Sequence, residues 1–417
     1  IGLVLLGFLL AIAPRPYNTV KSLVMPPLPQ LLTDPMLLWP TANSVQVVWF
    51  TEFAGTEHRV QLGDDPDQVI PATTLPLSQM QEDGQSNLRF GAPDRLTLRP
   101  IWRHEARVTG LTPGDRQPYQ VVSVDDAGRS VRSDEFTLTA LPQPGQALNI
   151  LLTSDHQAKP MTPANLQQVE ATVGAIDAVF FAGDLVNIPD RASEWFDDAD
   201  GRAFFPSLQG LAEARLAGRR YRGGAILQSA PLYPAVGNHE VMGKRDENLN
   251  LNQQFNAPVP RSVATLRYQA WAEASGQNLT EPEPAEWIKQ ASFNIDTVQE
   301  LFWGGEANPA SPDRPYYAVT IGDVRLIVLY ATNIWRPPDL EPNRPGRYAE
   351  AADTLNDASQ WGLGQHIFEP IQRGSAQYNW LEQELQRPDW QQAKYRVVML
   401  HHPPHSLGDN IVPAYTN

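Results

Sequence analysis

The chain has 417 residues, of which 42% are hydrophobic and 19% charged, so it can bury a large core and is not a disordered protein. At roughly 100 to 200 residues per domain, this length predicts two or more domains. The formal net charge of −15 argues against a large nucleic-acid-binding or anionic-membrane surface. Because the chain has no cysteine, disulfides, zinc-thiolate sites and cysteine nucleophiles are excluded.

The chain begins with an apolar run, IGLVLLGFLLAIA, at residues 1–13. This run is shorter than the roughly 20 residues that a membrane-spanning helix needs. It matches the apolar centre of a secretory signal, with Ala11-Ile12-Ala13 as the cleavage site. We therefore expect residues 1–27 to be a signal peptide or membrane anchor with a linker, and the protein to be exported. A buried core helix is the alternative.

Residues 28–142 contain short stretches in which apolar and polar residues alternate between turn signals, a pattern that predicts an antiparallel β-sandwich. The clearest stretches are residues 45–49, 58–62, 105–108, 119–124 and 136–139. Trp49 is the expected core anchor, and Leu111-Thr112-Pro113-Gly114 forms a turn before the strand that begins at Tyr119. In these features the segment resembles a fibronectin type III domain, which implies a structural spacer.

A Pro-rich linker follows at residues 141–145, and the periodicity then changes. The pattern predicts a strand at 147–153, a helix that Thr162 caps, and a second buried strand at 177–182. Pro163 occupies the first helical position, and one helical face carries Leu166, Val169 and Val173. A strand, a helix and a strand in this order indicate a parallel pair joined by a right-handed crossover, and hence a layered α/β domain.

Three further strands are expected at residues 232–236, at 317–330 with a break at Gly322, and at 395–400. Residues 187–229 and 241–314 lack a clean strand pattern. We expect these two segments to be insertions that shape access to a substrate.

Polar clusters follow four of the expected strands. They are Ser154-Asp155-His156-Gln157, Gly183-Asp184, Gly237-Asn238-His239-Glu240 and His401-His402. Any one of them has a structural explanation, such as a helix cap, a turn or a core histidine. In an open α/β sheet, however, the carboxyl ends of the strands line the ligand crevice, so the four clusters are expected to converge.

The residue types in these clusters indicate which metals they would bind. Carboxylate, amide and imidazole groups suit Mn, Fe, Zn or Mg rather than a soft metal. Two such ions that share one bridging carboxylate can clamp the attacking and leaving oxygens of a phosphoryl transfer. The glycines before Asp184 and Asn238 allow the tight turns that would direct these side chains inward.

At these residues the chain resembles the calcineurin-like metallophosphoesterases, and with the preceding sandwich it resembles their purple acid phosphatase branch. Gln377 to Glu382 is similar to the helix before the histidine strand in that branch. The resemblance implies a four-layer α/β domain over residues 147–417. It also implies a dinuclear centre of divalent ions whose bound hydroxide attacks a small phosphoester.

The resemblance also implies a role for each site residue. Asp155 would bind the first metal, Asp184 would bridge both metals, and Asn238 and His401 would bind the second. His239 would protonate the leaving oxygen or stabilise the transition state, with Glu240 as its support. His156, His402 and His405 each either contact phosphate or pack structurally.

Two positions depart from the family pattern. Gln157 stands where the general family has histidine and the purple branch has glycine, so it is expected either to bind metal weakly or to hydrogen-bond the bridging water. Asn187 stands where the purple branch has the tyrosine that binds and colours ferric iron. We therefore expect a colourless enzyme that uses Mn, Zn, Fe(II) or Mg.

The family's closing Gly-His-x-His motif does not occur after residue 401, and His405 is the last histidine of the sequence. Neither metal then has a full ligand set, so we expect the chain to be an incomplete fragment of a longer enzyme; a pseudoenzyme is the alternative. The expected activity is phosphomonoester hydrolysis. Two alternatives remain, a phosphodiesterase or nucleotidase with the same centre and a non-catalytic binding or adhesion protein.

Overall fold

The computed structural model describes residues 28–63, 65, 67–275, 284–304, 314–335 and 366–402. The expected export segment and His405 lie outside the described residues. Within the described part of the chain, no helix combines the length and the apolar character needed to cross a bilayer.

The N-terminal part of the chain forms two antiparallel sheets, and all five stretches with clear alternation form strands. The first sheet has the order β1 (Met36–Leu38), β2 (Ser44–Thr51), β8 (Trp102–Thr109) and β5 (Thr73–Pro76). The second has the order β10 (Ser130–Arg132), β9 (Gln117–Val124), β3 (Glu57–Leu62) and β4 (Val69–Pro71), with β11 (Phe136–Leu138) also on β9. A small hairpin pairs β6 (Gln81–Glu82) with β7 (Thr97–Leu98).

Strand β2 is buried on both faces. One face carries Trp49, which packs between the two sheets and whose Nε1 donates a hydrogen bond to Ser123 Oγ at 2.9 Å. The opposite face carries Val48 and Phe50, which belong to the core of the following α/β part. One sheet of this segment therefore lies between two cores.

The predicted strand, helix and strand unit is present. Strand β12 (Ile150–Thr153) pairs in parallel with β13 (Ala178–Phe181), which pairs in parallel with β16 (Leu232–Pro234). Helix α1 (Thr162–Val173) connects the first two strands. The predicted Thr162 cap is wrong: Met161 occupies the cap position, and the Thr162 hydroxyl donates to the His156 carbonyl at 3.4 Å.

A second sheet consists of β17 (Tyr317–Ile321), β18 (Val324–Val328) and β21 (Tyr395–Met399). The expected break at Gly322 is the turn of the hairpin that joins β17 and β18, and Gly322 has φ of +55° there. Strand β21 then pairs in parallel with β18, after α8 (Ala376–Gln386) and α9 (Pro388–Gln391). A short ribbon pairs β19 (Thr332–Trp335) with β20 (His366–Phe368).

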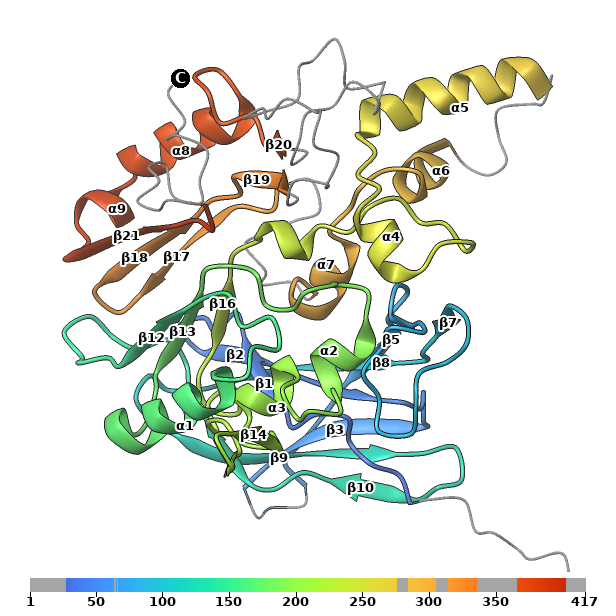
Figure 1. The fold of residues 1–417 in the computed structure, drawn as a ribbon. Helices are drawn as coiled ribbons and strands as arrows, with labels where there is room; N and C mark the ends of the chain where they lie inside the picture. The colour runs from blue at the N-terminus through green and yellow to red at the C-terminus, as the bar shows by residue number, and fades with distance from the viewer. Residues whose placement is uncertain are drawn as a thin grey trace, which may run out of the picture.

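The two segments without a strand pattern contain most of the remaining helices. The first holds α2 (Ala192–Phe196), α3 (Phe204–Leu208), β14 (Ala214–Leu216) and β15 (Arg219–Tyr221). The second follows η1 (Asn238–Glu240) and holds α4 (Leu251–Phe255), α5 (Arg261–Ser275), α6 (Pro284–Gln290) and α7 (Asp296–Phe302). Helix α5 projects from the body of the molecule, whereas α7 lies against it (Figure 1).

Candidate metal centre

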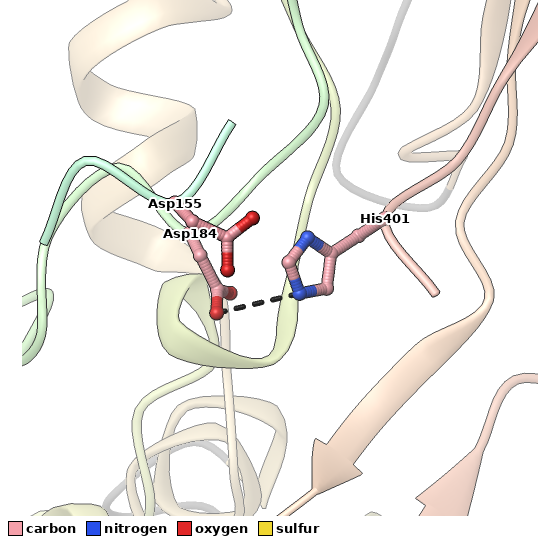
Figure 2. Close-up of side chains that lie close together, drawn as sticks. All are labelled: Asp155, Asp184 and His401. Atoms are coloured by element: carbon pink, nitrogen blue, oxygen red, sulfur yellow. Dashed lines mark ion pairs between the residues drawn. The ribbon is translucent and has the colours of Figure 1, made fainter. Parts of the chain in front are cut away.

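Three of the predicted metal ligands meet in space, and each comes from the loop beyond the carboxyl end of a different strand. Asp155 follows β12, Asp184 follows β13, and His401 follows β21. One ligand atom from each of them lies within 4.8 Å of the other two. The two carboxylates lie side by side and face the imidazole ring (Figure 2). The predicted convergence of these loops is therefore confirmed for these three side chains.

The loops can approach so closely because glycine stands in two of them. A Cβ atom on Gly183, whose φ is +90°, would lie 2.7 Å from the Gly237 backbone nitrogen. A Cβ on Gly237 would in turn overlap the Asp184 carboxylate. Asp155 and Asp184 have φ of +56° and +57°, a left-handed conformation that side-chain-bearing residues rarely adopt and that occurs most often at functional sites.

Glu240 joins the loops after β13 and β16 through three hydrogen bonds. It is 0% exposed, and its carboxylate accepts from the backbone N–H groups of Asp184, Leu185 and Gly237, each at 2.7 Å. Burial, reinforced by the charge of Asp184, raises the pKa of Glu240 to about 8. Glu240 therefore acts on Asp184 through the main chain, and its expected support of His239 stays a prediction.

Asp184 and His401 form the central pair of the site. His401 Nε2 lies 3.3 Å from Asp184 Oδ2, while Nδ1 lies 2.8 Å from the Ala182 carbonyl oxygen and donates to it. Burial alone would lower the pKa of His401, but the Asp184 carboxylate outweighs burial and raises it to about 9. The same interaction, opposed by burial, lowers the pKa of Asp184. Nε2 is therefore the ring atom directed at the carboxylate.

Asn238 lies in η1 and is buried. Its Nδ2 donates to the carbonyl oxygen of Trp335 at 3.0 Å, so strand β19 orients this amide group. With Nδ2 held in this way, the amide oxygen is the atom that has metal-ligand chemistry.

Gln157 also contacts the Asp184 carboxylate, and it does so through its amide nitrogen. Nε2 donates to Asp184 Oδ2 at 3.3 Å, and the Gln157 backbone N–H donates to the Leu185 carbonyl oxygen at 3.0 Å. The Asn187 side chain contacts the same residue, since its Nδ2 donates to the Gln157 carbonyl oxygen at 2.9 Å. Gln157 thus hydrogen-bonds a carboxylate of the site, and both its weak binding of a metal and its hydrogen bond to a bridging water stay predictions.

His239, the expected proton donor, is held on both sides of its ring. Its Nδ1 lies 2.7 Å from the Asn187 carbonyl oxygen, which can only accept, so Nδ1 carries a proton. Nε2 lies 4.0 Å from Asp184 Oδ2, and the ring centroid lies 5.3 Å from that of Phe255 in α4. The side chain remains 25% exposed, so Nε2 faces the site from a position that solvent reaches.

His156 takes the structural alternative. It is buried, its Nε2 lies 3.0 Å from Thr153 Oγ1, and its ring packs edge-on against Phe181 at 4.6 Å. Burial lowers the pKa of His156 to about 3, so this side chain is neutral. The His402 ring lies 5.5 Å from the Trp335 ring, at the β19 side of the site.

Three residues near His239 are not predicted by the sequence patterns. Phe255 packs on its ring, and Glu194 and Arg191 hold the loop that contains Asn187. All three lie in the segments that were expected to be insertions. The sequence offers one local signal, which concerns Arg191 and Glu194: they stand close to the apolar pair Trp195 and Phe196. Burial of the two aromatic side chains would bring the two charged side chains into the core as well.

Comparisons with known proteins give a structural likeness, but no protein-family model and no curated protein matches the chain. A solved structure of purple acid phosphatase PPD1 from yellow lupin (Lupinus luteus) seeds is similar over 88% of this chain, with 16% sequence identity and a TM-score of 0.49. The match covers 50% of that structure, so this chain spans about half its length.

Proposed function

We propose that this chain is a metal-dependent phosphoester hydrolase that acts on phosphomonoesters. One observation carries the proposal: the ligand atoms of Asp155, Asp184 and His401 converge within 4.8 Å, and the imidazole of His239 stands beside them. A metal-ligand set and a neighbouring group that can donate a proton are the two parts that metal-assisted hydrolysis requires.

The residues of the site fit a divalent metal ion. Two carboxylates and one imidazole nitrogen form an oxygen and nitrogen donor set that suits Mn, Fe, Zn or Mg. The Ala182 carbonyl oxygen accepts from His401 Nδ1 and so orients Nε2, as the outer partner of a metal-binding histidine does. In the dinuclear centre that we propose, Asp184 would hold both ions, Asp155 would hold the first, and His401 and Asn238 would hold the second.

Bound ions would neutralise phosphate charge and activate water, and the chain's own residues would do the rest. In its doubly protonated form, His239 would donate the Nε2 proton to the leaving oxygen and become neutral, while the Asn187 carbonyl oxygen keeps the proton on Nδ1. Glu240 holds the backbone of Asp184 and Gly237, so the two loops keep their separation. Gln157 hydrogen-bonds Asp184 and restrains the carboxylate.

The proposal is tested by hydrolysis assays on the full chain after chelation and reloading with Mn, Zn, Fe or Mg in turn. We expect reloading with at least one of these metals to restore release of p-nitrophenol from p-nitrophenyl phosphate. A preference for bis-(p-nitrophenyl) phosphate would assign the centre to phosphodiesters instead. If no metal supports hydrolysis of either compound while the metal binds, the chain is a binding protein and the proposal is wrong.

A further inference from the structure

The side chain of His239 is held in place by a buried ion network that begins far from it in the sequence. The network consists of Asp83, Arg191 and Glu194, which are 1%, 7% and 7% exposed. Asp83 comes from the N-terminal part of the chain, between β6 and β7, whereas Arg191 and Glu194 lie at α2. Charged side chains are rarely buried to this degree unless partners satisfy them, so each contact of the network has a structural consequence.

Glu194 is the member nearest to the site. Its Oε2 accepts from the backbone N–H of Asn187 at 2.5 Å and from that of Ile188 at 3.2 Å. These bonds restrain the main chain at Asn187 and Ile188. The carbonyl oxygen of Asn187 lies in the same stretch of backbone and accepts from His239 Nδ1 at 2.7 Å. Glu194 therefore acts on the imidazole through one residue of backbone.

Arg191 and Asp83 hold Glu194 in turn. Arg191 donates from one terminal nitrogen to Glu194 Oε1 at 3.1 Å and from the other to the two Asp83 oxygens at 3.3 and 3.4 Å. Asp83 Oδ2 also accepts from the backbone N–H of Leu251 at 2.7 Å, at the first turn of α4. The same helix carries Phe255, which packs on the His239 ring.

Two chains of contacts therefore connect the Arg191 guanidinium to the His239 imidazole. The first passes through Glu194 and the Asn187 backbone to Nδ1, and the second through Asp83 and α4 to the ring face. We propose that Asp83, Arg191 and Glu194 are positioning residues that hold His239 with its Nε2 turned toward the metal ligands. The catalytic part of this inference rests on the proposed function; the structural part does not.

The direct test measures the His239 imidazole itself. The full chain is labelled with ¹⁵N in its histidine side chains, with and without Zn²⁺, and the variant His239→Asn assigns the signal. We expect Glu194→Ala to speed solvent exchange of the Nδ1 proton by about tenfold or more, since the Asn187 backbone loses its anchor. Glu194→Gln still offers an oxygen to both N–H groups, so its exchange rate should stay within about threefold of the parent chain's.

Arg89→Gln is the matched control, because it removes a charge from an exposed ion pair with Glu213. If Glu194→Ala does not fold, as judged by near-ultraviolet circular dichroism, Arg191→Lys and Asp83→Asn replace it, with faster exchange than Arg89→Gln expected for both. Exchange as slow as in Arg89→Gln, in a folded Glu194→Ala or in these two variants, would overturn the inference.

A kinetic arm separates this inference from the proposed function. With an active metal-loaded enzyme, Glu194→Ala should misplace His239 and so lower kcat about 10- to 100-fold with KM little changed. Glu194→Gln should retain most of the parent chain's kcat. An equal loss in Glu194→Gln and Glu194→Ala would contradict a positioning role. If the parent chain shows no hydrolysis, the proposed function fails, but the exchange measurement still decides whether the network holds His239.

Discussion

Asp184 is the residue on which the candidate centre depends most, because groups from three loops contact its carboxylate. Gln157 and His401 contact Oδ2, and the His239 backbone N–H donates to Oδ1 at 3.0 Å. A bridging ligand needs its full negative charge, and the lowered pKa of Asp184 keeps that charge over the usual working range.

Replacement of this carboxylate with an amide should therefore remove metal and hydrolysis together. We expect Asp184→Asn to weaken metal binding by more than about 100-fold, beyond the loss caused by removing an outer partner of a ligand. Metal content measured by mass spectrometry after gel filtration, together with the hydrolysis assay, checks this. Asp200→Asn, which neutralises an exposed carboxylate, serves as the control. Normal turnover in Asp184→Asn would show that the bridging role is wrong.

His239 should behave differently, because it lies beside the ligand cluster rather than in it. His239→Ala is expected to lower kcat about 10²- to 10⁴-fold, the usual contribution of a general acid, while metal content stays near that of the parent chain. The two quantities are measured on the same preparation. Loss of metal from His239→Ala would instead make this residue a ligand.

At the scale of the secondary-structure elements, the turns that follow β13 and β16 approach each other closely. Gly183 needs both a positive φ and the absence of a Cβ, since that atom would lie 2.7 Å from the Gly237 nitrogen. Gly128 also has a positive φ, of +75°, but a Cβ there would meet nothing within 4 Å. Alanine substitutions at Gly128 and Gly183 therefore separate the free-energy cost of a left-handed backbone from the cost of steric overlap.

Gly128→Ala should reduce the free energy of unfolding by about 1 to 2 kcal/mol, the cost of a left-handed alanine. Gly183→Ala should lose a further amount of about 1 to 3 kcal/mol, because two turns must move apart. Urea denaturation followed by tryptophan fluorescence measures both variants. Equal losses of unfolding free energy in the two variants would mean that the two turns can move apart without cost.

The sequence allowed the strands and the site loops to be predicted, because each has a local cause. Period-two alternation marks β2, β3, β8 and β9, and the polar residues that follow three predicted strands mark Asp155, Asp184 and His401. Helices α2 and α3 escaped prediction for two reasons. Nearly every side chain in them is buried, so no polar face creates a helical period, and neither has a side-chain cap. Their aromatic side chains instead pack on one another and on Phe50.

At the scale of the whole molecule, the N-terminal sheets and the α/β part share specific bonds as well as a core. Trp39 Nε1 donates to the Phe302 carbonyl oxygen at the end of α7 at 2.7 Å, and Arg103 Nε donates to the Leu301 carbonyl oxygen at 3.3 Å. Both donors satisfy carbonyl groups that the helix itself leaves without partners.

Trp39→Phe keeps an aromatic ring at this contact and removes the donor. We expect it to lower the free energy of unfolding by about 1 to 3 kcal/mol, because a buried carbonyl loses its partner. Trp271→Phe, at a more exposed position in α5, should change it much less. Urea unfolding of the two variants and the parent chain gives the comparison, and equal effects would contradict the bond's contribution.

Asp190 makes the stability of this junction depend on pH. Its backbone carbonyl oxygen accepts from Gln81 N–H at 2.8 Å and its carboxyl oxygen accepts from Thr297 at 2.6 Å, so it joins three segments. Burial, only partly offset by the Thr297 hydrogen bond, raises its pKa from 3.8 to about 7. The folded chain therefore retains a proton between these two values that the unfolded chain has released.

It follows that this group stabilises the fold fully below pH 4 and that its contribution is lost as the pH rises through about 7. Asp190→Asn keeps an oxygen for Thr297 and cannot titrate. We expect the difference in unfolding free energy between the parent chain and Asp190→Asn to change by a few kcal/mol across this window and to level off above it. A difference that does not vary with pH would show that Asp190 titrates normally.

The burial of β2 on both faces has a consequence for how the molecule can be divided. Cutting the chain at the linker, residues 141–145, would expose Met36, Leu38, Val48 and Phe50 along one whole side of a sheet. A contiguous apolar surface of this kind favours aggregation. We therefore expect that the two parts do not fold as independent modules, and that heat or denaturant unfolds them in a single cooperative step.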